Sequence, residues 1–114
     1  MIKDKMSYED AAVLFKLLGD KTRLTMVSLL SADDVCVCEF VEIFQTSQPS
    51  VSQHLRKLRD KGLVKERKQG QWVFYSLNES SIHYPMAMAL VQELPDPKIM
   101  LNQIEADGLR VTCC

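Results

Sequence analysis

Residues 45–77, QTSQPSVSQHLRKLRDKGLVKERKQGQWVFYSL, decide the fold. The first half predicts a helix that begins near Ser47 and carries Pro49 in its first turn, where a missing N–H costs little. Gly62 is placed to end this helix in a left-handed cap. The inward-facing positions follow helical spacing: Val51, Leu55 and Leu58.

The pattern after this helix changes to a period of two. Two β-prone runs, Leu63–Lys68 and Trp72–Leu77, are separated by the short polar connection Gln69-Gly70-Gln71. Such runs around a glycine-containing connection predict a β-hairpin. One face of its second strand would carry Val73, Tyr75 and Leu77, and the other would carry Trp72, Phe74 and Ser76.

Three helices are predicted before this stretch. Ser7 has the position of a capping residue for the first helix, which Gly19 ends, and Asp20 can cap the second. A polar run at residues 31–34 separates the second helix from a short third one, and a tight turn follows. Their apolar stripes are Ala11, Leu14, Phe15 and Leu18; Leu24, Val27 and Leu30; and Phe40, Val41 and Phe44.

Further helices are predicted after the hairpin. An apolar helical segment runs from Ser80 to about Leu94, where prolines interrupt it, and a weaker helix runs from Lys98 to Ala106. The core order is therefore α-α-α-α-β-β-α. Two short helices joined by a tight turn and followed by a hairpin predict a mainly α fold with a β-hairpin wing, a winged helix-turn-helix.

The composition is that of an ordinary water-soluble domain. The chain has 114 residues, 46% hydrophobic and 25% charged, which fits one domain. It contains neither an apolar run of the roughly 18 residues that span a membrane nor the apolar segment of a secretory signal. We therefore expect a cytoplasmic protein with no membrane partner.

Charge is unevenly distributed along the chain. The net charge of −1 argues against a nucleic-acid partner, but residues 48–71 hold seven Lys and Arg against two acidic side chains. A basic region within a chain of acidic balance suits a polyanion. A solvated helix and hairpin would also explain the charge alone.

The exposed side of the helix and the tip of the hairpin are the candidate DNA-contacting elements. The N-terminal half of a recognition helix meets base edges in the major groove, where Gln suits adenine, Arg suits guanine and Ser suits bases or phosphates. The alternative is a polar helix face on an unrelated small bundle. The predicted DNA-binding residues are Ser47, Gln48, Ser50, Ser52, Gln53, His54, Arg56, Lys57, Lys68 and Gln71.

Within residues 8–94, the sequence resembles the ArsR/SmtB family of bacterial winged-helix repressors. Each motif is modest alone, and the combination is specific. Gln48–Leu58 with Gly62-Leu63-Val64 resembles that family's recognition helix, and Leu17–Leu24 resembles its entry into the second helix. Val35–Phe40 resembles its metal box on the third helix, and Trp72–Leu77 resembles its wing strand.

The resemblance implies a homodimer formed by the first helix and the helix after the wing. It also implies a repressor of a resistance operon that binds a pseudo-palindromic operator and leaves it when a metal or metalloid binds. No cofactor is implied for DNA binding itself. We assign residues 1–107 to one DNA-binding and dimerisation domain and residues 108–114 to a flexible tail that carries cysteines.

Four cysteines form two tight pairs, Cys36 with Cys38 and Cys113 with Cys114. This spacing indicates a thiolate site or a redox pair rather than a disulfide framework. Residues two apart on a helix point about 200° apart, so Cys36 and Cys38 can share one ion only if the helix start is irregular or opens on binding. Such strain would shift the recognition helix. A helix N-terminus also lowers the pKa of a thiol.

Two thiolates are too few for a tight site for a soft ion. Trivalent arsenic or antimony takes three, and cadmium, lead or zinc commonly takes four. Some family members have a third cysteine one turn later, where this chain has Val41. We therefore predict a metal site of Cys36 and Cys38 with Cys113, Cys114 or both, from the same or the partner subunit. Arsenite or antimonite is the expected inducer, with cadmium, lead or zinc as alternatives.

Three other interpretations of these residues stay open. The cysteines of the third helix can be small buried hydrophobic residues, or the same thiols can sense oxidants. A thiol enzyme or metal chaperone would leave the basic helix unexplained, and the chain has no Cys-x-x-Cys or glycine-rich phosphate loop, so we expect no enzyme. The family's second metal site needs Asp and His pairs, whereas here the helix after the wing offers only His83, which we expect at the surface or an interface.

Overall fold

The computed structural model describes residues 6–110, so Cys113 and Cys114 lie outside the described residues. The elements are α1 (Tyr8–Leu18), α2 (Lys21–Ala32), β1 (Val35–Cys36), α3 (Val37–Phe44), α4 (Gln48–Asp60), β2 (Val64–Gln69), β3 (Trp72–Leu77), α5 (Tyr84–Val91) and α6 (Lys98–Ala106). The sheet is antiparallel with strand order β1-β3-β2. The β2–β3 hairpin is the wing, and the predicted winged helix-turn-helix is confirmed.

Short polar side chains cap three of the helices, and the caps at Ser7 and Asp20 were predicted. Ser7 Oγ accepts a hydrogen bond from the backbone N–H three residues later at 3.0 Å, and Ser47 Oγ does so at 3.3 Å. The Asp20 carboxylate accepts the corresponding bond from Arg23 N at 3.0 Å. This backbone hydrogen bond is the main reason that the pKa of Asp20 is lowered. Each cap satisfies an N–H that the helix leaves unpaired.

Left-handed residues shape the turns on both sides of α4. Gln45, with φ 51°, ends α3 and turns the chain toward the next helix. Gly62, with φ +78°, follows α4, and the Leu63 N–H donates to the Leu58 carbonyl at 3.1 Å. This is the capping geometry that the glycine predicts. It delivers the chain directly into β2.

The structure differs from the sequence prediction in two elements. The strand β1 was not expected; it pairs Val35 with Tyr75 and Cys36 with Phe74. The helix expected from residue 80 begins only at Tyr84 and ends at Val91. Asn78 Oδ1 and Ser81 Oγ accept hydrogen bonds from backbone N–H groups in residues 80–83, and these local bonds compete with a helix.

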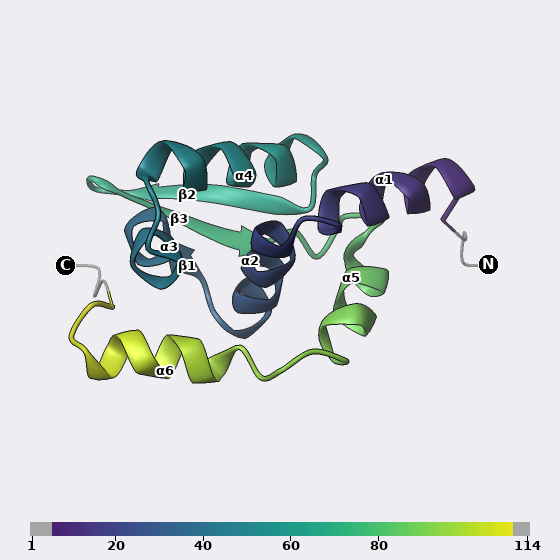
Figure 1. Cartoon of the computed structure of the whole chain (residues 1–114). Helices are drawn as coiled ribbons and strands as arrows, with labels where there is room; N and C mark the ends of the chain where they lie inside the picture. The colour runs from purple at the N-terminus through teal and green to yellow at the C-terminus, as the bar shows by residue number, and fades with distance from the viewer. Residues whose placement is uncertain (1–5, 111–114) are drawn as a thin grey trace.

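The elements form layers around α2. In Figure 1, α4 lies along one side of the molecule next to β2, and α6 lies along the opposite side. The sheet, α2 and α3 stand between them, and α6 contacts both α2 and α3. The first helix extends from one end, which gives the molecule a long dimension of 46 Å.

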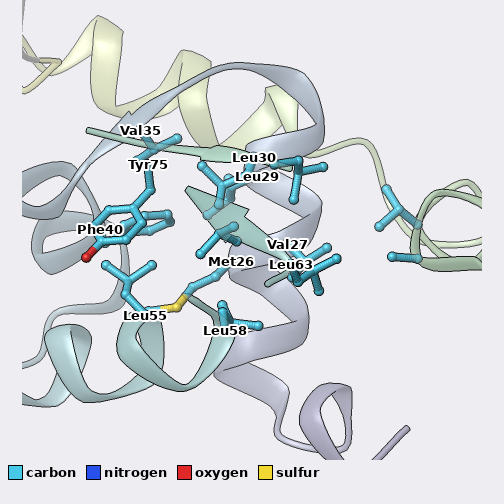
Figure 2. Packing of buried hydrophobic residues seen from close by; sticks show 14 of the residues in the cluster. Met26, Val27, Leu29, Leu30, Val35, Phe40, Leu55, Leu58, Leu63 and Tyr75 are labelled. Atoms are coloured by element: carbon cyan, nitrogen blue, oxygen red, sulfur yellow. The ribbon is translucent and has the colours of Figure 1, made fainter. Parts of the chain in front are cut away.

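The core joins the inner side of α4 to α2 and the sheet. Figure 2 shows Met26 of α2 beside Leu55 and Leu58 of α4, with Phe40 and Tyr75 close by. The two leucines are fully buried, as their spacing predicts. None of the helices within residues 6–110 has both the length and the apolar character that a membrane crossing needs.

Shortening Leu55 tests how firmly the core holds α4. We expect Leu55→Ala to lower the free energy of unfolding by about 2–5 kcal/mol, because it leaves a cavity between α4 and α2. Denaturant unfolding at a fixed protein concentration measures the change. The exposed neighbour Arg56→Ala is the control, with an expected effect within about 0.5 kcal/mol. A similar loss for both variants would contradict this account.

Candidate nucleic-acid interface and thiol site

The predicted DNA-contacting residues lie at the surface of two neighbouring elements. Those exposed on or just before α4 are Ser47, Gln48, Gln53, Arg56 and Lys57, and those exposed at the wing tip are Lys68 and Gln71. Three further predicted residues of α4 are half-buried: Ser50, Ser52 and His54. The helix and the hairpin therefore present polar and basic groups that suit a groove and its phosphates.

His54 makes contacts inside the protein. Its Nδ1 atom is 3.3 Å from the Arg23 guanidinium and 3.8 Å from the Asp20 carboxylate, and 23% of its side chain is exposed. Arg23 also donates from Nε to the Leu17 carbonyl at 2.7 Å. These bonds fasten α4 to the junction of α1 and α2. His54 therefore has a structural role that its sequence position did not indicate.

Two of the basic residues in the charged region are engaged within the chain. Arg59 pairs with Glu66 of β2. The Arg67 guanidinium stacks over the Phe74 ring at 4.9 Å and lies 3.4 Å from the Asp34 carboxylate. These contacts brace the wing against α4 and the start of β1. They leave the other basic side chains of the region as the better candidates for phosphate contacts.

Cys36 and Cys38 lie side by side at the junction of β1 and α3. Cys36 is extended, with φ −83° and ψ 152°, so the pair does not follow helical geometry. The Cys38 thiol donates to Cys36 Sγ across 3.4 Å. The helix start is therefore irregular, which is the first of the two conditions under which these sulfurs were expected to share one ion, and the strand–helix junction brings them together without any opening of the helix.

The pKa of the Cys38 thiol differs from the expectation that the helix N-terminus lowers it. Burial first, and then the Cys36 thiol and the Glu39 carboxylate, raise the pKa of Cys38 to about 12. The favourable field at the helix N-terminus is outweighed, because the half-buried thiol loses part of its hydration and the Cys36 thiol and the Glu39 carboxylate lie close to it. Cys38 is therefore a protonated thiol at neutral pH rather than a ready thiolate.

Glu39 connects the thiol pair to the C-terminal end of the described chain. Its carboxylate is fully buried. Oε1 accepts the Cys36 backbone N–H at 2.7 Å, and Oε2 accepts Arg110 Nε at 2.5 Å. Burial alone would lower the pKa of Arg110, but hydrogen bonds and charge attraction from Glu39 and Asp33 raise it on balance. Sequence reasoning missed both residues; the position of Glu39, three after the capping residue, was the available signal.

A cleft of about 350 Å³ joins the thiol pair to the DNA-contacting elements. Cys36 and Cys38 line it on one side, Gln48 at the start of α4 on another, and Gln71 and Trp72 at the wing tip complete it. A group bound to the sulfurs would therefore lie against both elements that are predicted to contact DNA.

The described residues hold only part of the predicted metal site. Within residues 6–110 no three His, Cys, Asp or Glu side chains gather in a way that could hold a metal ion. Cys36 and Cys38 provide two sulfurs, and the other two predicted ligands, Cys113 and Cys114, fall outside the described part. A third protein ligand of the predicted site would come from there or from a second chain.

His83, which was expected at the surface or at an interface, is buried within the chain. Only 5% of the residue is exposed, and Nε2 lies 3.0 Å from the Asp10 carbonyl oxygen of α1. Its Nδ1 atom has no hydrogen-bond partner among the described residues. His83 thus fastens the start of α5 to α1. The sequence gives no sign of this bond, since its partner is a backbone carbonyl far along the chain.

Comparisons with known proteins agree with this geometry. Residues 20–66 match the family model described as "Bacterial regulatory protein, arsR family". The chain is 36% identical to the arsenic resistance transcriptional regulator ArsR2 of Pseudomonas putida, over 89% of this chain and 94% of the relative. The chain belongs to the ArsR family. It is accordingly a transcriptional repressor and not an enzyme.

Two further comparisons show how far the similarity extends. Identity to the arsenical resistance operon repressor of Staphylococcus xylosus is 40%, over 69% of this chain and 76% of the relative. The solved structure titled "Reduced HlyU from Vibrio cholerae N16961" has a TM-score of 0.66 and 34% identity, over 74% of this chain and 87% of that one. The ArsR-family expectation is thus confirmed for fold and class.

Salt dependence distinguishes phosphate contacts from base contacts on α4. We expect Lys57→Ala to weaken binding to all DNA sequences similarly and to lower the slope of log K against log salt by about one unit. Gln53→Ala should instead reduce discrimination between operator and unrelated DNA. Fluorescence anisotropy at several salt concentrations measures both effects. Lys98→Ala is the control and should leave the slope unchanged, because this exposed lysine belongs to α6, which Figure 1 shows on the opposite side of the molecule from α4.

Proposed function

We propose that this repressor binds operator DNA as a homodimer in the cytoplasm and leaves it when a soft metalloid binds its cysteine thiols. The inducer is arsenite or antimonite. Cys36, Cys38 and the cysteines at positions 113 and 114 are its ligands, and α4 and the wing contact the operator. DNA binding itself needs no cofactor.

The shared cleft is the observation that carries this proposal. The Cys36–Cys38 pair, the start of α4 and the wing tip line the same cleft. An inducer held by these sulfurs favours any arrangement of α4 and the wing that accommodates it. If that arrangement fits the operator less well, inducer binding weakens the affinity for DNA, and DNA binding weakens the affinity for the inducer by the same free energy.

Trivalent arsenic suits these thiols because its reaction with them is balanced. Arsenite at neutral pH is As(OH)₃, and each S–As bond forms as one hydroxyl leaves with the thiol proton as water. Three thiols therefore yield one pyramidal AsS₃ unit and three waters. The adjacent sulfurs of Cys36 and Cys38 would supply two of these bonds. A third thiol must close the pyramid, and the C-terminal pair offers one.

The proposed dimer interface is formed by α1 and α5. Large apolar side chains are exposed on α1 and on or just before α5: Tyr8, Phe15, Ile82 and Met86. Exposed apolar side chains of this size on both helices support an interaction surface there. The bond between His83 and the Asp10 carbonyl holds the two helices together, so they would present this surface as one unit.

A charge placed in this surface tests the dimer. We expect Phe15→Asp to shift the protein from dimer to monomer, because a buried unpaired carboxylate in the interface is costly. Sedimentation equilibrium measures the change in mass. Lys98→Asp on α6 is the control and should remain dimeric. A dimeric Phe15→Asp protein would place the interface elsewhere.

An operator-release titration tests the inducer. Reduced protein on its upstream DNA is challenged with arsenite, antimonite, cadmium, lead, zinc and peroxide. We expect arsenite and antimonite to release it, and we expect Cys36→Ser and a chain ending at residue 112 to lose this response. Val37→Ser, which adds the same hydroxyl between the cysteines but removes no thiol, is the control and should still respond.

Other outcomes would point to the alternatives. Release only by cadmium, lead or zinc would indicate a four-thiolate site for a divalent ion. Release by peroxide alone would favour a redox sensor, which the 3.4 Å separation of Cys36 and Cys38 allows. In that case the two thiols would give two electrons and two protons to the peroxide, forming one disulfide and two waters. A response retained after loss of residues 113 and 114 would exclude the tail as ligand.

A further inference from the structure

We propose that a basic cleft between α1 and the end of α4 holds backbone phosphates at the centre of the operator, between its two half-sites. This α1–α4 cleft has a volume of about 470 Å³, and its charged lining residues are Lys16, Arg23, Lys57, Asp60 and Lys61. The inference rests on the proposed function, in which a homodimer binds operator DNA. It adds the first helix as a contact element besides the exposed side of α4 and the wing.

The α1–α4 cleft has a surplus of positive charge. Four of its lining side chains are basic, and Asp60 is the acidic one. The Asp60 carboxylate lies 3.8 Å from the guanidinium of Arg59, which is outside the lining, so its charge is partly compensated from elsewhere. Within the described part of the chain, no ion pair involves Lys16, Lys57 or Lys61. The cleft therefore offers three unpaired ammonium groups to a polyanion.

Helix ends alone do not explain this arrangement. A lysine near the C-terminal end of a helix complements the helix dipole, which would account for each lysine separately. Lys16 is in the last turn of α1, Lys57 is in the last turn of α4, and Lys61 is its C-cap. The tertiary structure brings these two helix ends to one cleft. Gathering like charges raises the free energy, and an anion bound between them lowers it again.

Internal hydrogen bonds hold the sides of the cleft in place. Arg23 Nε donates to the Leu17 carbonyl at the end of α1 at 2.7 Å, and Arg23 Nη1 lies 3.3 Å from His54 Nδ1 of α4. One guanidinium thus links α1, α2 and α4 at this point. Because the cleft is already formed, binding a phosphate there requires the ordering of lysine side chains but no ordering of the backbone, which keeps the entropy cost low.

The α1–α4 cleft lies at the opposite end of α4 from the wing tip. In Figure 1 the wing tip is next to the start of α4, whereas α1 lies beyond its end. A dimer formed through α1 and α5 would place both clefts near its two-fold axis and both wing tips far from it. DNA that crosses both α4 helices would then meet the clefts at its centre. Half-sites of such dimers are about 34–36 Å apart, and the phosphates between them are the ones that the clefts would hold.

Substitutions that remove or keep the lysine charge test for phosphate contact. On the upstream DNA, we expect Lys16→Gln and Lys61→Gln each to lower the slope of log K against log salt by about one unit, because each contact releases counterions. Both side chains are exposed, so the fold should not change. Lys16→Arg and Lys61→Arg keep the charge and should keep the slope. Lys98→Gln on α6 is the control for charge loss elsewhere and should leave it unchanged. Unchanged slopes for both glutamine variants would overturn the proposal.

Uncharged linkages in the DNA test where the contact lies. Hydroxyl-radical footprinting first locates the two half-sites, and single methylphosphonate linkages, each lacking one phosphate charge, are then placed at successive positions. We expect linkages between the half-sites to weaken binding of the original chain about 2- to 5-fold, the range for an exposed charge pair. The same linkages should have little effect on the variant with both glutamines, since its contact is already lost. Equal losses for the two proteins at every central linkage would overturn the proposal.

The outcomes separate this inference from the proposed function. A dimer that binds its upstream DNA but tolerates every central methylphosphonate would refute this inference alone. A monomer bound to DNA would place the sensitive linkages at one end of a single half-site, which would refute both the dimer and the central contact. Absence of any binding to the upstream DNA would refute the proposed function and this inference together. The inducer does not enter the test, because no metalloid is added.

Discussion

The arrangement of the thiol site depends on the Glu39 carboxylate, which stands at the start of α3 without solvent contact. Its hydrogen-bond partners must therefore come from the protein. A buried charge is tolerated only when it is paired and hydrogen-bonded. Here the Cys36 N–H and the Arg110 guanidinium supply the bonds. One side chain therefore fixes the strand–helix junction that carries the cysteines and also fastens the chain that follows α6.

The backbone connects this strand–helix junction directly to the elements that are expected to contact DNA. The strand β1 pairs with β3 of the wing through Cys36 itself, and the left-handed Gln45 joins α3 to α4 through a tight turn. The apolar residues on the inner side of α4 are fully buried against α2. Because such a core is closely packed, these side chains cannot rearrange one at a time. In the proposed function, a change at the sulfurs would act on α4 and the wing through these backbone connections.

Much of the fold could be predicted because its signals are local. Ser7, Asp20 and Ser47 cap the helices that they precede, and Gly62 takes the left-handed conformation that only a few residues adopt without strain. The spacing of apolar residues correctly assigned the buried side of α4, and hence which polar side chains remain outside. Cys36 and Cys38 could be predicted to act as a pair because they are two residues apart in the sequence.

By itself, the sequence determined the helix order, the wing, the exposed basic region and the candidate thiols, since each depends on residues a few positions apart. Only the tertiary structure decided that β1 pairs with β3, that His83 bonds α1, and that Arg110 reaches Glu39. These partners lie dozens of residues apart. No local periodicity encodes them, because they arise when burial forces distant polar groups to satisfy one another.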